Sequence, residues 1–568
     1  MENLIIFEDE DLLAINKPAG LNTHSPGPFA GMGIYEWLKN RQPRWARLAV
    51  LHRLDKETSG LLLFGKSTLA NRSLTQQFSE GTVQKKYFFL TDRSVTFKNL
   101  KIESALVRAG EKYVNRPLHV GSERAETHFK KLADRESEEN PGFRIQSPKL
   151  ETIQNSKLRT QNFLVEARPL TGKTHQIRVH AAANGFPILG DAVYGGTAAA
   201  RIYLHAAELI FKHPSSGQEL KLIAPTDFAC DPRLALRAAV IDFNLTNTFR
   251  LIDGAADGWP GWHLDKLGDF LLSESWEPPG DDQKSFSMDA MGKFAARGVY
   301  HKTLNRHVQN TTREKSPQFI CGEIAPEEFL VREYGVKFAL RFSEGYSVGL
   351  FLDQRENRCR LLTNYIGPDF FISDISSLGS LEENLCPLQG LTVLNTFAYT
   401  CGFSVCAARA GAKVTSLDLS KKYLNWGKQN FALNHLEMSN HEFICGDVFD
   451  WLRRWAKKKR VFDVVILDPP TFSHSKKSGC FQAEKNYGKL IKAALPILKP
   501  NGILFASNNT ASFAPENFLA IIKTEITAAR RKIVREQYVP QPPDFPISRE
   551  GPAYLKTVWL QINNDDSH

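Results

Sequence analysis

The sequence predicts a multidomain chain that combines α+β and α/β architecture, and two patterns support this fold class. Near the N-terminus, short alternating apolar runs such as LIIFEDEDLLAINK are broken by Pro and Gly turns, which is typical of a strand-rich domain. Toward the C-terminus, apolar strands alternate with amphipathic helices, which favours a parallel sheet covered by helices. At ~150 residues per domain, the 568 residues allow about three to four folding units.

Three domains are expected along the chain. Residues 1–235 form the strand-rich domain, residues 240–332 a small β-rich connecting domain, and residues 333–563 the α/β domain. The segment Glu277–Ser285, EPPGDDQKS, is the best candidate for a linker because Pro and Gly interrupt regular structure.

The composition excludes several classes of protein. Hydrophobic residues make up 42% and charged residues 24%, values that exclude a mainly disordered or collagenous chain. No stretch approaches the ~20 apolar residues of a membrane span. The acidic start MENLIIFEDEDLL lacks the basic region of a signal peptide, so a soluble, cytoplasmic protein is expected.

Charge and cysteine usage add two expectations. The net charge of +10 fits a polyanionic partner, although many basic proteins bind no nucleic acid. All eight cysteines lie from Cys230 onward without a C-x-x-C pair, which favours buried thiols in a reducing compartment over disulfides or zinc. We therefore predict no metal site.

A first group of motifs surrounds an aspartate. The segment 52–60 reads HRLDKETSG, and a lone Asp beside Arg is usually a loop salt bridge. Three further segments occur with it: NKPAGL at 16–21, KKY at 85–87 and TGKTHQIRVH at 171–180. In this order and spacing they resemble the RluA-type pseudouridine synthases, over residues 4–230.

That resemblance implies a mixed, mainly antiparallel sheet and an enzyme that isomerises uridine to pseudouridine in RNA without cofactor or metal. Asp55 would act as nucleophile or as base, which the sequence does not decide. Arg178 would pair with Asp55 and keep it ionised. Tyr87 would contact the uracil as the candidate base for the proton at carbon 5, and Arg53 would fill the gap left by the flipped nucleotide. A phosphate contact for Arg178 and a core position for Tyr87 stay open.

Other residues of these motifs are interpreted as non-catalytic. His52, His175 and His180 are interpreted as structural or RNA-contacting residues rather than metal ligands. Lys173 stands where the family commonly has Arg, which keeps the charge but loses the planar fork.

A second group of motifs begins at Leu391. An apolar strand leads into a small-residue turn with a single glycine, Gly402, then a helix, and a second strand that ends at Asp418. An acid in that position commonly binds ribose hydroxyls, whereas the missing G-x-G-x-x-G disfavours a nicotinamide cofactor. Asp447 follows the next strand, and DPPTF at 468–472 ends another.

These segments resemble class I S-adenosylmethionine-dependent methyltransferases with a Rossmann-like fold, and more narrowly the RlmI and RlmK groups that methylate large-subunit ribosomal RNA, over residues 245–563. The resemblance implies S-adenosylmethionine as cofactor and a donor lined by Asn395, Phe397, Tyr399 and Gly402. Asp418 would bind the donor ribose, Asp447 would lie near its adenine, and Asp468 would lie beside both the donor methyl group and the acceptor base. Phe472 would stack on that base, unless it is a core aromatic.

Two residues of the segment GLFLDQR at 349–355 are ambiguous. Asp353 and Arg355 either bind the donor or close the domain, and the sequence does not separate the two roles.

The atom of the base that receives the methyl group is predicted from the absence of a cysteine in one segment. Methylation of cytosine carbon 5 generally requires a thiolate, and RlmI-type relatives carry it in a Ser-Cys-Ser segment after a late strand. The matching stretch here is FASNNT at 505–510, which resembles the RlmK group and favours a guanine ring nitrogen. Cys480 keeps the cytosine alternative open.

The two halves together predict a bifunctional RNA-modifying enzyme, monomeric and acting on RNA, with ribosomal RNA favoured. Three alternatives remain: a synthase domain that serves only as an RNA-binding platform, a methyltransferase for a small molecule or protein, and a non-catalytic ribosome-assembly factor.

Overall fold

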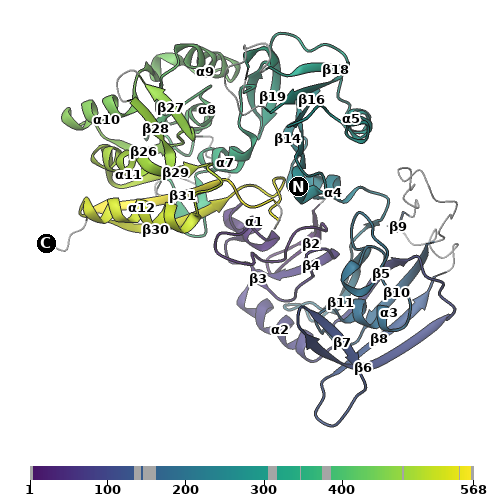
Figure 1. Cartoon of the computed structure of the whole chain (residues 1–568). Helices are drawn as coiled ribbons and strands as arrows, with labels where there is room; N and C mark the ends of the chain where they lie inside the picture. Colours follow the sequence, from purple (N-terminus) through teal and green to yellow (C-terminus); the bar gives the residue numbers. More distant parts are fainter. Residues whose placement is uncertain are drawn as a thin grey trace. The chain divides into compact units, whose positions relative to one another are not determined.

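A computed structural model describes residues 4–132, 143–144, 162–304, 316–345, 347–373, 386–475, 479–548 and 551–564 (Figure 1). The chain divides into two compact units. The first comprises residues 1–25, 33–39 and 47–242, and the second comprises residues 26–32, 40–46 and 243–568.

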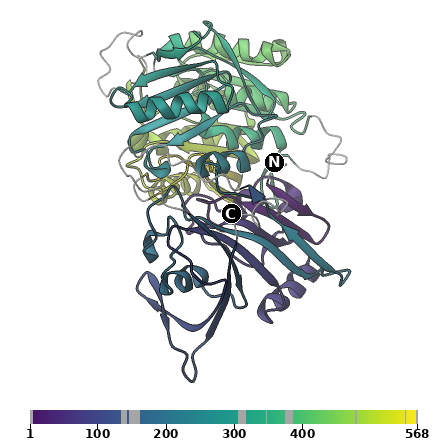
Figure 2. The ribbon, with the colours of Figure 1, turned by 90° about the vertical axis from the view of Figure 1, so that its right-hand side faces the viewer.

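The first unit is built on one sheet that has eleven strands in the described part of the chain. Its main path runs β1-β2-β4-β11-β5-β10-β8-β6-β7, with β3 paired to β4 and β12 paired to β11. The β4–β11 pair is parallel and the other pairs of this sheet are antiparallel, so the expected mixed, mainly antiparallel sheet is confirmed. Its long strands are purple to blue in Figure 2. The strands are β1 (Ile5–Glu8), β2 (Leu12–Lys17), β3 (Ala49–Val50), β4 (Ser59–Gly65), β5 (Gln84–Thr91), β6 (Asn99–Ala109), β7 (Lys112–Arg116), β8 (Arg124–Lys131), β10 (Phe163–Pro169), β11 (Leu204–Lys212) and β12 (Glu219–Ile223).

Short helices cover this sheet. Helix α2 begins at an N-cap, Ser67, whose side chain accepts from the Ala70 N–H, and it packs Leu74 against the apolar residues of β2 and β4. A second apolar cluster joins β5, β8 and β10 to α3. The helices of the unit are α1 (Ile34–Lys39), α2 (Thr68–Ser79), α3 (Gln176–Ala183) and α4 (Pro232–Val240).

The second unit starts with a five-stranded sheet in the order β14-β15-β16-β17-β18. The expected linker at Glu277–Ser285 is wrong from Asp281 onward, because helix α5 begins there. Strands β16 and β17 are parallel, and parallel neighbours need a crossover connection, which α5 supplies. The elements are β14 (Thr248–Asp253), β15 (Trp262–Leu267), β16 (Phe270–Ser275), α5 (Asp281–Lys293), β17 (Gly298–Thr303) and β18 (Gln318–Gly322).

A β-hairpin, β19 (Phe329–Glu333) with β20 (Val336–Leu340), spans the expected boundary between residues 332 and 333. Its buried residues belong to one continuous apolar cluster that includes Phe270 of β16 and Val464 of the following sheet. The small sheet and the α/β part of this unit therefore share a core.

The α/β part contains a seven-stranded sheet in the order β25-β24-β23-β26-β29-β31-β30. The five strands from β25 to β29 are parallel, and β31 is antiparallel to both of its neighbours, β29 and β30. Because the chain proceeds from β23 first toward β25 and then back to β26, the strand order reverses beside β23. Ligands of such sheets bind at the carboxyl ends of the strands at this reversal. The strands are β23 (Thr392–Thr396), β24 (Lys413–Asp418), β25 (Glu442–Cys445), β26 (Phe462–Leu467), β29 (Leu498–Asn508), β30 (Arg531–Pro540) and β31 (Lys556–Asn564).

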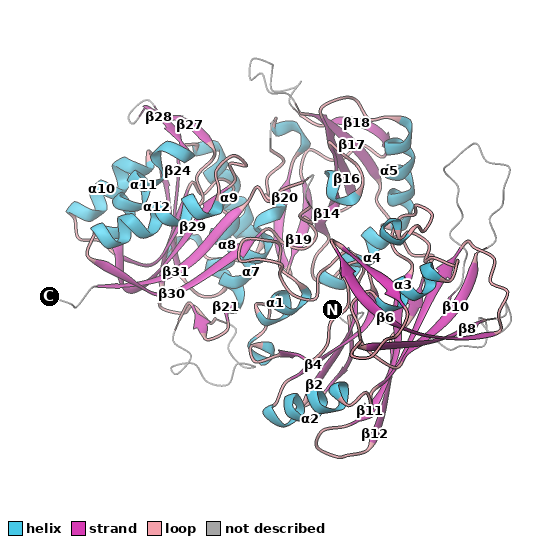
Figure 3. Ribbon diagram, turned by 60° about the horizontal axis from the view of Figure 1, so that its bottom comes forward, coloured by secondary structure: helices cyan, strands magenta, loops and turns pink. Residues whose placement is uncertain are grey.

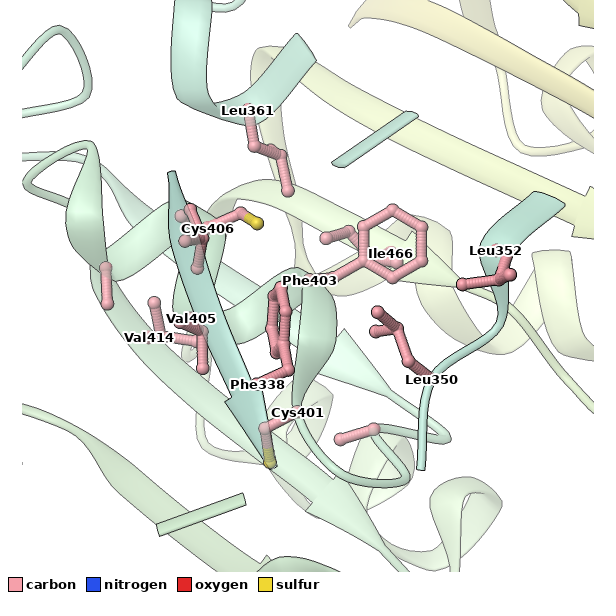
Figure 4. Close-up of a cluster of buried hydrophobic side chains, with 14 of the residues drawn as sticks. Phe338, Leu350, Leu352, Leu361, Cys401, Phe403, Val405, Cys406, Val414 and Ile466 are labelled. Atoms are coloured by element: carbon pink, nitrogen blue, oxygen red, sulfur yellow. The ribbon is translucent and has the colours of Figure 1, made fainter. Parts of the chain in front are cut away.

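Helices cover both faces of this sheet (Figure 3). Along β26, Val464 and Ile466 belong to one apolar cluster, whereas Val465 and Leu467 belong to the other, as the two-residue repeat of a strand requires. Figure 4 shows part of the first cluster, where Phe403 of α8 lies among side chains of β20 and β26. Helices α7 (Arg355–Thr363), α8 (Gly402–Arg409) and α9 (Lys421–Leu433) pack on that face, and α10 (Val448–Lys457), α11 (Ala483–Ala494) and α12 (Pro515–Ala528) on the other.

Two short hairpins complete the unit. Strands β21 (Tyr365–Gly367) and β22 (Phe370–Phe371) follow α7, and strands β27 (Phe472–Ser475) and β28 (Gly479–Gln482) follow β26. Within the described ranges, no helix is long and apolar enough to cross a membrane.

Candidate active sites

The Asp55 loop connects β3 to β4 in the first unit. The hydroxyl of Thr23 donates to the Leu54 carbonyl at 2.8 Å and accepts the Leu54 N–H at 3.1 Å, and the Thr58 N–H closes a turn on the Asp55 carbonyl. The loop ends at Gly60, whose φ is +113° and where an added Cβ would lie 2.2 Å from the Ala206 carbonyl oxygen of β11. Only glycine fits this close approach of two strands.

Lys17, at the end of β2, hydrogen-bonds to the Asp55 loop as well. Its buried ammonium group donates to the carbonyls of Pro18, Leu21 and Lys56, at 2.9, 2.7 and 3.1 Å. Burial lowers the pKa of Lys17 to about 7. The Gly20 N–H also donates to the Lys56 carbonyl, so the NKPAGL segment and the Asp55 loop form one hydrogen-bonded assembly.

Replacing Lys17 by Met is expected to destabilise the first unit by about 1–3 kcal/mol, because buried carbonyls lose their donor. Denaturant unfolding followed by circular dichroism measures the loss. Lys56→Met is the matched control, since Lys56 is exposed and contributes through its backbone. Equal stability of the two variants would contradict this role of Lys17.

Arg178 is held between two aspartates. Its Nε and Nη2 donate to the two carboxylate oxygens of Asp191 at 2.7 and 2.9 Å, and its Nη1 donates to Oδ2 of Asp55 at 3.2 Å. Asp191 is fully buried, whereas the Asp55 side chain is 33% exposed. The bidentate pair with Asp191 fixes the guanidinium plane, so a third donor is aimed at the carboxylate that remains accessible.

Tyr87 is partly buried, whereas Arg53 is exposed. Tyr87 is on β5, opposite Ala167 of β10, and its hydroxyl pKa is raised by burial and further by the charge of Asp55. The hydroxyl is therefore protonated at neutral pH, and a base role requires that its proton first passes to another group. Arg53 is exposed, two residues before Asp55.

The three histidines of the motifs have different surroundings. Nε2 of His52 accepts the Leu63 N–H at 3.0 Å, and its ring stacks on Phe78. His180 is fully buried between the hydroxyls of Ser104 and Thr127. These two are structural, whereas the Nε2 atom of His175 lies 3.7 Å from Oδ2 of Asp55.

In the second unit, the turn between β23 and α8 has an unusual backbone. Phe397, Tyr399 and Cys401 adopt left-handed conformations, with φ of 54°, 47° and 63°. Such conformations are costly for residues other than glycine and concentrate at ligand sites. Asp418, at the end of β24, accepts the Tyr399 N–H at 2.9 Å and the Ser420 N–H at 2.8 Å, so it fixes the turn.

The other residues predicted to surround this turn are packed or hydrogen-bonded within the second unit. Asn395 is buried and donates to the Ser404 hydroxyl, which joins β23 to α8. A Cβ at Gly402 would lie 3.3 Å from Leu350, so this glycine permits close packing. Asp447 is buried at the N-terminus of α10 and accepts the Asp450 N–H.

Asp468 follows β26 at the reversal of strand order. Its Oδ1 accepts Nε2 of Gln354 at 3.2 Å, and the same Gln354 nitrogen donates to the Ser507 hydroxyl at 2.8 Å. Burial raises the pKa of Asp468 to about 6, and the nearby charge of Asp353 acts in the same direction. Phe472, four residues on, is 59% exposed.

The two ambiguous residues both contact other side chains of the second unit. Arg355 donates to both carboxylate oxygens of Asp544, at 2.8 and 2.5 Å, and both side chains are almost fully buried. Asp353 accepts the Tyr554 hydroxyl at 3.2 Å. The Arg355 pair joins α7 to the segment between β30 and β31, which favours the domain-closing role for this arginine.

Sequence reasoning gave no role to Asp191, Lys17, Gln354 or Ser507. Ser507 lies 153 residues from its partner Gln354, and Asp191 lies 13 residues after its partner Arg178, outside the motif that contains the arginine. Gln354 directly follows Asp353 in a motif already singled out, so a search of every polar side chain in that motif would have included it.

Comparisons with known proteins distinguish the two units. A family profile described as RNA pseudouridylate synthase matches residues 11–183, and one described as S-adenosylmethionine-dependent methyltransferase matches residues 385–560. A ribosomal RNA large subunit methyltransferase of Deinococcus radiodurans is 31% identical over 353 residues, which cover 60% of this chain and 78% of that protein. The chain belongs to the large-subunit ribosomal RNA methyltransferase family. Its N-terminal part carries a pseudouridine synthase domain.

Two further relatives extend this likeness. Ribosomal RNA large subunit methyltransferase K/L of Psychrobacter cryohalolentis is 34% identical over 44% of this chain and 30% of its own length. A crystal structure of a methyltransferase complexed with SAH is 26% identical, with a TM-score of 0.47 over 68% of this chain and 98% of the other.

This family uses S-adenosylmethionine, and the residues at the reversal of strand order fit it. Asp418 binds two backbone N–H groups and still has acceptor lone pairs, which suit ribose hydroxyls. The rings of Phe351 and Tyr399 lie 5.4 Å apart beside the left-handed turn and provide an apolar wall. When bound, the donor supplies an electrophilic methyl group.

Asp418→Ala is expected to weaken binding of S-adenosylmethionine about 10- to 100-fold, which corresponds to the loss of hydrogen bonds to a charged acceptor. Asp418→Asn should lose less, because it retains one acceptor oxygen. Isothermal titration without RNA measures both. Unchanged donor affinity in a folded Asp418→Ala protein would show that the donor ribose binds elsewhere.

Proposed function

We propose that the chain is a bifunctional enzyme that isomerises uridine to pseudouridine and methylates a base in RNA, with large-subunit ribosomal RNA as the favoured substrate. The observation that carries the first activity is the accessible carboxylate of Asp55, held by an arginine that a buried second aspartate orients. A platform that only binds RNA has no need of this arrangement. A monomeric state and a cytoplasmic location remain predictions.

The isomerisation requires one bond to be exchanged for another. The glycosidic bond from the ribose to uracil N1 breaks, a bond from the ribose to carbon 5 forms, and the hydrogen of carbon 5 leaves as a proton while N1 gains one. Asp55 acts on the ribose or the ring as an ionised carboxylate. Arg178 donates a hydrogen bond to it and fixes its orientation, and Tyr87 hydrogen-bonds to the uracil.

Loss of the carbon-5 hydrogen gives a direct test. Large-subunit RNA transcribed with uridine tritiated at carbon 5 should release tritium to water when the purified chain is added without S-adenosylmethionine. Transfer RNA labelled in the same way distinguishes the substrate class. A folded protein that releases tritium from neither RNA would contradict the isomerase proposal and favour the platform alternative.

For the methyl transfer we favour a guanine ring nitrogen as the acceptor. Ser507 and Asn508, at the end of β29, present a hydroxyl and an amide beside the strand that carries Asp468. Asn508 is buried, and its Nδ2 has no hydrogen-bond partner among the described residues, so it can donate to an acceptor atom of the base. A ring nitrogen is already nucleophilic and needs only positioning in line with the methyl group. The Cys480 side chain lies outside the described residues.

The methylated nucleoside decides between the two bases. RNA incubated with methyl-labelled S-adenosylmethionine is digested and separated by chromatography with mass detection, and label should be found in a methylguanosine. Recovery of 5-methylcytidine would overturn the guanine proposal and direct attention to Cys480.

A further inference from the structure

We propose that His175 is a positioning residue that, with its proton on Nε2, holds the same oxygen of Asp55 as Arg178 does and so leaves Oδ1 for the substrate. This inference rests on the proposed isomerase function. It assigns to His175 and Tyr194 a role in fixing which carboxylate oxygen reacts.

Tyr194 determines which ring nitrogen of His175 carries the proton. The Tyr194 oxygen accepts the backbone N–H of Tyr113 at 3.0 Å and lies 2.8 Å from Nδ1 of His175. We infer that the phenol donates its proton to Nδ1, because the opposite direction would put the imidazole proton on Nδ1 and turn the Nε2 lone pair of the neutral ring toward the Asp55 carboxylate. A neutral imidazole that accepts at Nδ1 has its own proton at Nε2.

The environment of the imidazole favours its neutral form. Burial lowers the pKa of His175, and the charge of Asp55 only partly opposes this shift. The ring is enclosed by Tyr113 and Tyr194, each with its centroid 5.7 Å away in an edge-on arrangement. Its surroundings therefore disfavour the imidazolium form, which would also break the bond from Tyr194.

The Nε2–H group faces one oxygen of Asp55. Nε2 lies 3.7 Å from Oδ2, and Nη1 of Arg178 lies 3.2 Å from the same oxygen. No donor among the described residues contacts Oδ1. The distance of 3.7 Å exceeds that of a hydrogen bond, but such contacts commonly shorten when substrate binds.

The backbone of His175 makes a sharp test possible. It is left-handed, with φ of 56°, at the N-terminus of α3, where Asn is better tolerated than Gln. The amide nitrogen of Gln, however, reaches the position of Nε2, whereas that of Asn does not. A structural role and a donor role therefore predict opposite orders for these two substitutions.

We expect His175→Asn to lower kcat for pseudouridine formation about 10- to 100-fold with KM nearly unchanged, and His175→Gln to restore most of it. Tritium release on labelled large-subunit RNA measures both constants, and thermal melting confirms folding. An Asn variant as active as wild type, or more active than the Gln variant, would overturn the proposal.

A second measurement does not depend on activity. Long-range proton–nitrogen correlation spectra of histidine-labelled protein report the tautomer, and the His175 signal is identified by its loss in His175→Gln. We expect the Nε2–H tautomer in wild type and a mixture in Tyr194→Phe, which keeps the ring but removes the hydroxyl. A Nδ1–H tautomer or an imidazolium at neutral pH would overturn the proposal, whether or not the chain forms pseudouridine. Absence of pseudouridine formation by the wild-type chain would instead count against the proposed function.

Discussion

Asp55→Asn is expected to abolish pseudouridine formation, with a loss of at least about 10³-fold. The amide has the shape of the carboxylate but neither its charge nor its basicity, so it can attack neither the ribose nor the ring. Tritium release from labelled RNA measures the loss. The fold should be retained, because the Asp55 side chain is 33% exposed and Arg178 keeps its two bonds to Asp191.

Two controls make this result specific. Glu57→Gln removes a carboxylate from the same loop and should leave isomerisation largely intact. Methyl transfer by the Asp55→Asn protein should also continue, because that chemistry uses residues of the second unit. Substantial tritium release by a folded Asp55→Asn variant would show that another group carries out the reaction.

Asp468→Asn is expected to lower methyl transfer by about 10²-fold or more while pseudouridine formation continues. We expect the carboxylate to accept hydrogen bonds from the acceptor base and to favour the positive charge that develops on it. Donor affinity should change little, because we expect Asp418 rather than Asp468 to bind the donor ribose. Single-turnover transfer from labelled S-adenosylmethionine measures the rate, with Asp450→Asn as the control carboxylate.

The same aspartate predicts a pH dependence. Because burial raises the pKa of Asp468 to about 6, the carboxylate is the main form above that pH and the neutral acid below it. Wild-type transfer should therefore be constant above pH 7 and decline as the pH falls through 6. Methyl transfer by the Asp468→Asn variant should be slow and should not decline as the pH falls through 6. A decline retained in the variant would assign the titration to another group.

Much of the fold was predictable because it rests on local patterns. Residues 464–467 are apolar throughout and lie between helical segments, as expected for a strand covered on both faces, and the structure buries alternate residues in two clusters. The start of α5 was missed because Pro and Gly precede it. Its signals were present: acids in the first turn, and Gln283, whose side chain accepts the Gly280 N–H.

The sites were predictable to the extent that they lie within motifs. The approach of Arg178 to Asp55 was expected from the resemblance, and the structure places the two 3.2 Å apart. The hydrogen bonds between Arg178 and Asp191 and between Tyr194 and His175 depend on the tertiary arrangement of the strands and turns. Local sequence patterns do not predict that arrangement. A role that depends on which imidazole nitrogen of His175 carries the proton can be assigned only from the three-dimensional structure.

The most direct test of a bifunctional enzyme is one nucleoside analysis of unmodified large-subunit ribosomal RNA, incubated with the purified chain in the presence and absence of S-adenosylmethionine. We predict pseudouridine in both samples and a methylated base only in the sample with the donor. A methylated base without any pseudouridine would contradict the account, since the Asp55 site would then be an RNA-binding platform without catalysis.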